Sequence, residues 1–118
     1  MRDFRKLEIW KDSVALAKKI YQATNGFPNH EKYGLCSQMN RAVVSIPSNI
    51  AEGCSRKTTI EFSRFLDIAL GSSFELETQI EISKQVSYLT EEVYENLLQE
   101  LHVVQRRINA FRETLKMK

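Results

Sequence analysis

Apolar residues recur every three or four positions along most of this chain, with polar residues between them. This spacing predicts four amphipathic helices, at about residues 7–24, 31–52, 59–88 and 91–116. No stretch alternates with a period of two, so strands are not expected. Because the connections between the helices are short, neighbouring helices should be antiparallel. The pattern therefore predicts an all-α, up-down-up-down four-helix bundle in one domain, residues 1–118.

Each predicted helix has an apolar face that should line the core. For the first two helices these faces contain Leu7, Trp10, Val14, Ala17 and Tyr21, and Met39, Val43, Ile46 and Ile50. For the last two helices they contain Phe62, Phe65 or Leu66, Ala69, Ser73, Leu76, Ile80 and Ser83, and Leu97, Leu101, Val104, Ile108, Phe111 and Leu115. Apolar residues that fall outside these faces include Ile9, Ile20, Leu70, Ile82, Val86 and Leu98. We expect several of these to be exposed on a monomer and to form a subunit interface.

The ends of the predicted helices carry recognisable signals. Gly53 should end the second helix, because glycine is favoured just beyond a helix C-terminus. Thr58 and Glu61 have the spacing of a capping box, in which each side chain can bond to the backbone of the other residue. Thr90, followed by two glutamates, should cap the fourth helix.

Two residues inside the predicted helices break local rules. Pro47 removes a backbone donor and crowds the carbonyl of Val43, which predicts a kink or a destabilisation of about 3 kcal/mol. Gly71 lies in a run of small residues in the third helix, where glycine costs about 1 kcal/mol relative to alanine. We expect a neighbouring helix to approach Gly71 closely.

A polar stripe runs along the second helix and contains Arg41, Ser45, Ser48 and Glu52. Two interpretations of it remain open. In the first, Ser45 and Asn49 satisfy backbone groups that a kink at Pro47 exposes, as part of an interface. In the second, Ser45, Asn49 and Glu52 only cap and solvate the helix end. A pairing of Arg41 with an acid of the third helix, such as Glu75, is a further structural option.

The net charge is only +2, but its distribution is uneven. Basic residues exceed acidic ones in residues 1–57 and 106–118, whereas acidic residues dominate residues 58–105. Two readings remain: solvated helix faces with dipole bias, or a basic patch for an anionic partner. For the second reading the candidate RNA or partner contacts are Arg2, Arg5, Lys6, Arg56, Lys57, Arg106, Arg107 and Arg112.

The composition is that of an ordinary globular domain, with 42% hydrophobic and 27% charged residues. No apolar run of about 18 residues predicts a membrane span, and no secretory signal is visible. Cys36 and Cys54 lie near opposite ends of one predicted helix, too far apart for a disulfide. We therefore expect free thiols and a cytoplasmic location.

No familiar catalytic or metal-binding pattern occurs in the chain. Phe27 and Gln99 stand three positions before His30 and His102, so the Glu-x-x-His motif of di-iron bundles is missing. Neither cysteine belongs to a CxxC pair, and no phosphate-binding loop is present. We expect no enzyme activity, no catalytic residue, no cofactor, no bound metal and no small-molecule substrate.

Aromatic residues can stack on the bases of single-stranded RNA. Trp10, Phe62, Phe65 and Phe111 lie on the predicted inner faces and are better explained as core residues. The remaining candidate contact residues are Phe4, Tyr33, Tyr88 and Tyr94.

Several motifs together resemble one bacterial family over the whole chain. They are Phe4-x-x-Leu7-x-x-Trp10, Phe27-Pro28-x-x-Glu31-x-Tyr33-Gly34-Leu35, Gln38-x-x-Arg41-Ala42, Ser45-Ile-Pro-Ser-Asn-Ile-Ala-Glu-Gly53, Glu61-Phe62, Ala69-x-Gly71-Ser72 and Glu75-x-Glu77-Thr78. The chain resembles the small four-helix bundle proteins encoded by intervening sequences in 23S ribosomal RNA genes. The most specific motif, Ser45 to Gly53, contains Ser45, Pro47, Asn49, Glu52 and Gly53, which with Arg41 are the candidate interface residues.

The resemblance implies a four-helix bundle that assembles into a ring-shaped homopentamer, without an established enzymatic activity. It also implies a link to structured RNA or to an RNA-handling protein. The leading hypothesis is a non-enzymatic oligomeric adaptor that contacts RNA through basic residues. The rival hypothesis is a protein–protein scaffold with no RNA contact of its own.

Overall fold

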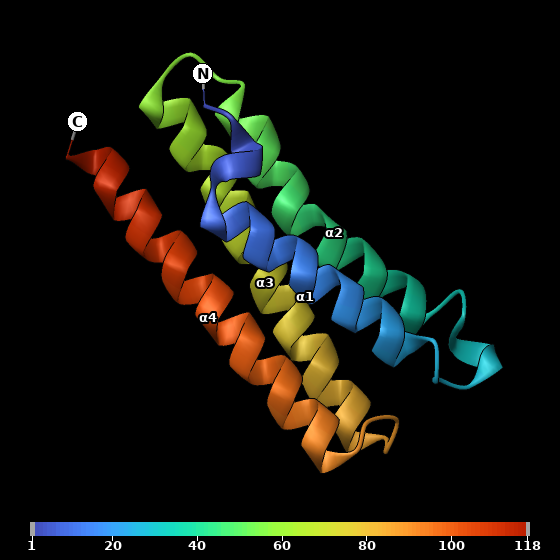
Figure 1. Ribbon diagram of the computed structural model, residues 1–118. Helices are drawn as coiled ribbons and strands as arrows, with labels where there is room; N and C mark the ends of the chain where they lie inside the picture. The colour runs from blue at the N-terminus through green and yellow to red at the C-terminus, as the bar shows by residue number, and fades with distance from the viewer. Residues whose placement is uncertain (1, 118) are drawn as a thin grey trace.

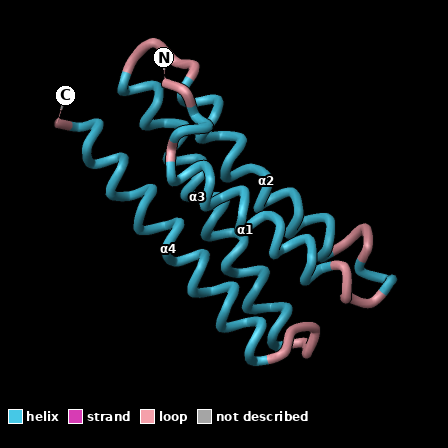
Figure 2. Tube along the Cα trace, viewed as in Figure 1, coloured by secondary structure: helices cyan, strands magenta, loops and turns pink. Residues whose placement is uncertain are grey.

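The computed structural model of the protein describes residues 2–117, which contain four long helices and no strand (Figures 1 and 2). The helices are α1 (Glu8–Thr24), α2 (Leu35–Cys54), α3 (Thr59–Gln85) and α4 (Glu91–Lys116). Short 3-10 turns at Phe4–Lys6 and Asn29–Glu31 precede α1 and α2. The predicted all-α class is confirmed.

The four helices form a single elongated body, 46 × 24 × 20 Å, in which α1 and α3 lie diagonally opposite each other. Each helix contacts two neighbours, in the cyclic order α1, α2, α3, α4. Links between α1 and α4 join Asp12 to Arg107 and Lys19 to Glu100, so residue numbers rise along one helix and fall along the other. Figure 1 shows both termini and the α2–α3 connection at one end of the body. These relationships are compatible with the expected up-down-up-down order.

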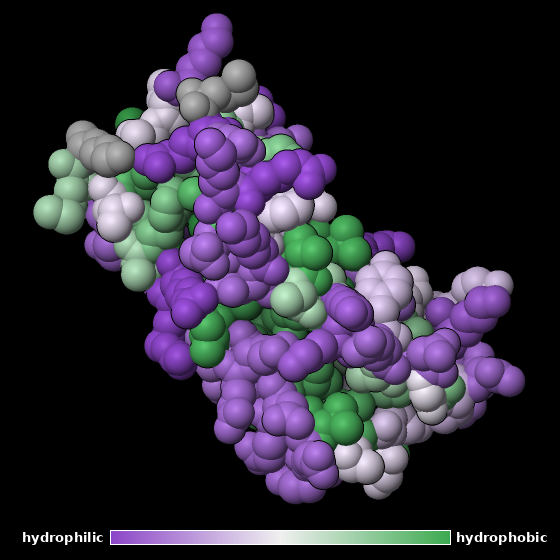
Figure 3. Space-filling view, in the orientation of Figure 1, coloured by the Kyte–Doolittle hydropathy of each residue, from purple (hydrophilic) through white to green (hydrophobic). Residues whose placement is uncertain are grey.

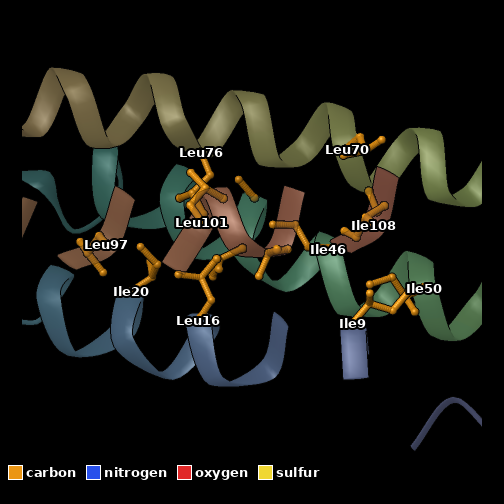
Figure 4. Close-up of a cluster of buried hydrophobic side chains, with 14 of the residues drawn as sticks. Ile9, Leu16, Ile20, Ile46, Ile50, Leu70, Leu76, Leu97, Leu101 and Ile108 are labelled. Carbon is orange, nitrogen blue, oxygen red and sulfur yellow. The ribbon is translucent and has the colours of Figure 1, made fainter. Parts of the chain in front are cut away.

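The core confirms the predicted inner faces of α2, α3 and α4 (Figure 4). Their buried residues include Met39, Val43, Ile46, Ile50, Leu66, Leu76, Ile80, Leu97, Leu101, Val104, Ile108 and Leu115. Leu70, which the sequence pattern left outside, is also buried. A wide stripe of apolar residues on each of these helices therefore removes most of their large side chains from water.

The predicted inner face of α1 was only partly correct, because Leu7, Trp10 and Ala17 pack against the core but another set of residues is fully buried. The buried residues are Ile9, Ser13, Leu16, Ile20 and Thr24, whereas Val14 and Tyr21 are 41% and 49% exposed. Polar side chains are tolerated on the buried face because each has a hydrogen-bond partner. The Ser13 hydroxyl donates to the carbonyl of Ile9 at 2.6 Å, and the Thr24 hydroxyl donates to Oδ1 of Asn40 at 3.2 Å.

Two helix ends differ from the prediction. α2 begins at Leu35 rather than near residue 31, because Glu31 belongs to a separate turn and its Oε1 accepts from the Leu35 amide at 3.1 Å. α3 ends at Gln85 rather than residue 88, because Ser87 adopts a left-handed conformation with φ of 67°. The amide of Tyr88 then donates to the carbonyl of Ser83 at 2.8 Å, which closes the helix with a Schellman motif.

The predictions for both glycines were also wrong. A helix approaches Gly53, where only a helix end was expected, and none approaches Gly71, where a close approach was expected. α2 continues through Pro47 and through Gly53 to Cys54, so Gly53 does not end the helix. A Cβ atom at Gly53 would lie 2.7 Å from a ring carbon of Phe62, which shows that this position is a close helix–helix approach. At Gly71 no atom lies within 4 Å of the corresponding position, so no helix of the same chain approaches it.

Candidate functional site

Five of the predicted basic contact residues lie at one end of the bundle. The backbone amide of Arg2 donates to the carbonyl of Cys54 at 3.3 Å, which holds the N-terminal segment against the end of α2. The α2–α3 connection begins at the residue after Cys54. The N-terminal segment and this connection together form a surface that we call the basic end, which contains the exposed residues Arg2, Arg5, Lys6, Arg56 and Lys57.

Aromatic rings orient several cations of the basic end. The Arg2 guanidinium lies 5.3 Å from the ring centre of Phe111, and that of Arg56 lies 4.7 Å from the ring centre of Phe65. Arg56 also approaches Glu52 at 3.8 Å. Such cation–π contacts stabilise an exposed guanidinium by only about 0.5–1 kcal/mol and leave its charge available to a partner.

The three predicted contact residues of α4 lie in the C-terminal half of that helix and are not among the five residues of the basic end. Arg107 pairs with Asp12 at 2.5 Å, and Arg112 pairs with Asp67 of α3. Arg106 is exposed and has no carboxylate within 4 Å in the part of the chain that the structure describes. The structure therefore divides the predicted basic set in two, and it gives Arg107 and Arg112 an intramolecular role.

The polar stripe of α2 connects α2 to α3. The hydroxyls of Ser45 and Ser72 lie 2.8 Å apart, and the Asn49 amide donates to the carbonyl of Ser45 at 2.8 Å and to its hydroxyl at 2.9 Å. Pro47 is buried and Glu52 is exposed. The side chains of Ser45 and Asn49 thus bond within the chain, which favours a structural role for this part of the motif.

Arg41 lies apart from the Ser45–Asn49 network. It is exposed, and no pair with Glu75 forms among residues 2–117. Instead it lines a groove beside the α1–α2 connection, together with Tyr33, which is 88% exposed. Sequence reasoning missed this groove, although it had identified both residues separately.

Two other predicted aromatic contacts are bonded to carboxylates within the chain. The Tyr88 hydroxyl donates to Glu31 at 2.9 Å, and the Tyr94 hydroxyl donates to Glu81 at 2.5 Å. The bond to Glu81 is the main cause that raises the pKa of Tyr94 to about 12. The pKa of Glu31 is lowered chiefly by the Leu35 amide and then by Tyr88. Tyr88 therefore joins the α3–α4 connection to the turn before α2, and Tyr94 joins the first turns of α4 to the last turns of α3.

Two apolar surfaces remain exposed on diagonally opposite helices. The outer surface of α3 contains Ile60, Ile68, Phe74, Ile82 and Val86, which are 47–68% exposed. The outer surface of α1 contains the misassigned Val14 and Tyr21. On the face of the molecule that Figure 3 shows, separate hydrophobic areas interrupt a mostly hydrophilic surface. Of the six residues expected to be available for an interface, Ile82 and Val86 are exposed, Leu98 is half-buried, and Ile9, Ile20 and Leu70 are buried.

The described residues contain no cluster of three or more side chains able to hold a metal ion. Burial raises the pKa of the Cys36 and Cys54 thiols, which lowers their reactivity at neutral pH. Within residues 2–117, no helix combines the length and the apolar character that crossing a membrane requires.

Comparison with known proteins identifies proteins that are similar over most of the bundle. The family model described as 23S rRNA-intervening sequence protein matches residues 5–110. A similar solved structure is a protein of unknown function from the S23 ribosomal protein family of Bacteroides thetaiotaomicron. It superposes with a TM-score of 0.79 at 22% identity, covering 88% of this chain and 97% of that protein. Among curated proteins there is no significant match.

Proposed function

The chain belongs to the family of 23S rRNA-intervening sequence proteins, and we propose that it is a non-enzymatic, self-associating adaptor that contacts RNA through its basic end. The observation that carries this proposal is the grouping of five exposed cations from two chain segments on one end of a rigid bundle. Lysine and arginine side chains on such a surface bind phosphates and release counterions, without reading a base sequence. We also propose a cytoplasmic location, which the two free thiols support.

Self-association compensates for the low charge of one chain. A net charge of +2 supports only weak attraction to a polyanion, but a ring presents the same patch several times. We propose a homopentamer in which the outer surface of α1 on one copy meets the outer surface of α3 on the next. Because these surfaces are different and lie on opposite sides, their contact is head-to-tail, the type that forms a ring when the rotation between successive copies closes.

The test compares two charge reversals in RNA-binding measurements at several salt concentrations. Lys57→Glu changes the basic end, and Arg106→Glu makes the same charge change on α4, where the side chain is also exposed. We expect Lys57→Glu to weaken binding to a structured RNA and to lower the slope of log affinity against log salt by about one, whereas Arg106→Glu has little effect. Equal effects of the two reversals, or affinity independent of salt, would contradict the proposal.

A second candidate is a protein–protein scaffold without direct RNA contact, and the exposed apolar surface of α3 favours it. In this case the assembled protein retains no RNA at physiological salt. A second protein copurifies with the unmodified chain and is lost when Phe74, which is 56% exposed, is changed to aspartate. In the RNA-contacting adaptor, by contrast, the unmodified protein retains RNA at physiological salt without a second protein.

A further inference from the structure

An open groove lies beside the α1–α2 connection, at the end of the bundle opposite the basic end (Figure 1). Its volume is about 730 Å³, within the range of roughly 300–1,000 Å³ that is usual for small-ligand sites. The last turn of α1, the connection and the first turns of α2 form its walls. We call it the tyrosine groove and define it by Tyr21, Asn25, Lys32, Tyr33, Asn40 and Arg41.

The groove exposes two aromatic rings beside cations. Tyr33 is 88% exposed and Tyr21 is 49% exposed. The Lys32 ammonium lies 5.4 Å from the ring centre of Tyr33, so a positive charge accompanies this ring. Tyr33 is thus unlike Tyr88 and Tyr94, whose hydroxyls are bonded to carboxylates, because its ring surface is open to a ligand.

The charge of the groove is positive and uncompensated. None of the described residues that line it is acidic, and Arg41 forms no ion pair within residues 2–117. Glu31 lies in the same connection, but its two oxygens accept from the Leu35 amide and the Tyr88 hydroxyl. A ligand that combines a negative group with a flat aromatic ring is therefore complementary to the groove.

Polar groups on the wall add hydrogen-bonding capacity. The Asn40 side chain is held by the Thr24 hydroxyl at 3.2 Å, and Asn25 is exposed at the end of α1. Amide side chains both donate and accept hydrogen bonds, as the edges of nucleobases do.

We propose that the tyrosine groove binds an unpaired nucleotide of single-stranded RNA, with its base stacked on Tyr33 and its phosphate beside Arg41 and Lys32. A base paired within a duplex cannot reach a tyrosine ring, so this site selects unpaired nucleotides, whereas the basic end accepts phosphates of any fold. The choice of RNA rests on the proposed function, because the groove itself is complementary to any unpaired nucleotide.

The experiment measures binding of a fluorescein-labelled oligouridine of eight nucleotides, and of the matching oligodeoxyuridine, by fluorescence anisotropy. Tyr33→Ala should weaken binding about 5- to 150-fold, the usual effect of removing one stacking ring. Tyr33→Phe keeps the ring and should bind as the unmodified protein does. Val93→Ala, which shortens an α4 side chain that is 38% exposed and lies outside both apolar surfaces, serves as the control and should have no effect.

A second measurement tests the phosphate contact. Arg41→Ala should lower the slope of log affinity against log salt by about one, and Arg106→Ala, the same change on α4, should not. If DNA binds as tightly as RNA, an unpaired nucleotide remains the ligand and the restriction to RNA is overturned.

The outcomes separate this inference from the proposed function. If Lys57→Glu loses RNA binding and Tyr33→Ala keeps the affinity of the unmodified protein, the nucleotide site in the groove is overturned and the basic end is supported. The reverse result would support the groove and contradict the basic end. If Tyr33→Ala and Tyr33→Phe weaken binding equally, stacking is not involved and the inference fails. If Tyr33→Ala changes the mass of the oligomer but not the RNA affinity, the groove is a subunit contact and the proposed nucleotide site is overturned.

Discussion

Gly53 of α2 lies directly against the ring of Phe62 on α3, where an added Cβ atom would come within 2.7 Å of the ring. The same position is 3.0 Å from the Cβ atom of Phe65. Phe62 is buried and its ring packs edge-on against Phe111 at 5.6 Å, so the ring cannot move freely to accept a methyl group. This contact explains why glycine occupies a helical position near the α2–α3 connection.

Gly53→Ala should therefore destabilise the protein by about 1–3 kcal/mol, the usual effect of overpacking a core. Gly71→Ala is the matched control, because it adds the same methyl group to an exposed helical position with no atom within 4 Å. It should stabilise the protein by about 1 kcal/mol through helix propensity. Urea unfolding followed by circular dichroism measures both changes. A Gly53→Ala variant as stable as the unmodified protein would contradict the close contact.

Ser87→Gly should stabilise the chain by about 0.5–1 kcal/mol. Ser87 has φ of 67°, a left-handed conformation that strains residues with a Cβ atom and suits glycine. Ser55, which caps α2 with φ of −81°, provides the comparison, because Ser55→Gly relieves no such strain. Thermal unfolding that ranks Ser55→Gly above Ser87→Gly would argue against the Schellman end of α3.

Tyr94 should give the protein a stability loss in alkaline solution. The pKa of Tyr94 is raised from about 10 to about 12, mainly by its bond to Glu81. Because the folded state holds this proton more tightly than the unfolded state, the contribution is complete below pH 10 and is lost as the pH rises toward 12. The free energy of unfolding should fall over this interval in the unmodified protein.

The control for this measurement is Tyr94→Phe, which removes the ionisable group and should lose this part of the pH dependence. Absorbance titration near 295 nm should show Tyr94 ionising last, and its late phase should vanish in the variant. An unchanged late phase in Tyr94→Phe would mean that another tyrosine carries the raised pKa.

Self-association should depend on the exposed apolar surfaces of α1 and α3. Ile82→Glu places a charge on the α3 surface, where the native side chain is 47% exposed, and should dissociate the assembly without loss of helicity. Val14→Glu should do the same from α1. Val93→Glu alters an α4 residue that is 38% exposed and lies outside both surfaces, and it should leave the assembly intact.

Light scattering gives the mass of each variant, and circular dichroism gives its helicity. A stable monomer for the unmodified protein at micromolar concentration would refute self-association. Dissociation by Val93→Glu alone would place the interface on α4.

Local sequence signals determined the helices and many of their ends. The predicted cap at Thr58 was correct, since its hydroxyl accepts from the Glu61 amide at 3.1 Å, although the Glu61 side chain bonds to the Thr58 hydroxyl rather than to its backbone. Thr90 caps α4 in the same way. The inner faces of α2, α3 and α4 were also predictable, because helical periodicity places their large side chains on one stripe. These features depend on residues a few positions apart, which the sequence shows directly.

Only the tertiary structure decided the inner face of α1 and the roles of the glycines. α1 has two apolar stripes of similar quality, and the buried one is selected by neighbouring helices that satisfy Thr24 through Asn40. The roles of Gly53 and Gly71 depend on whether another helix lies nearby, which residue type alone does not specify. The tyrosine groove is also a tertiary feature, because it appears only when the end of α1 and the start of α2 place Tyr21 and Arg41 beside one cavity.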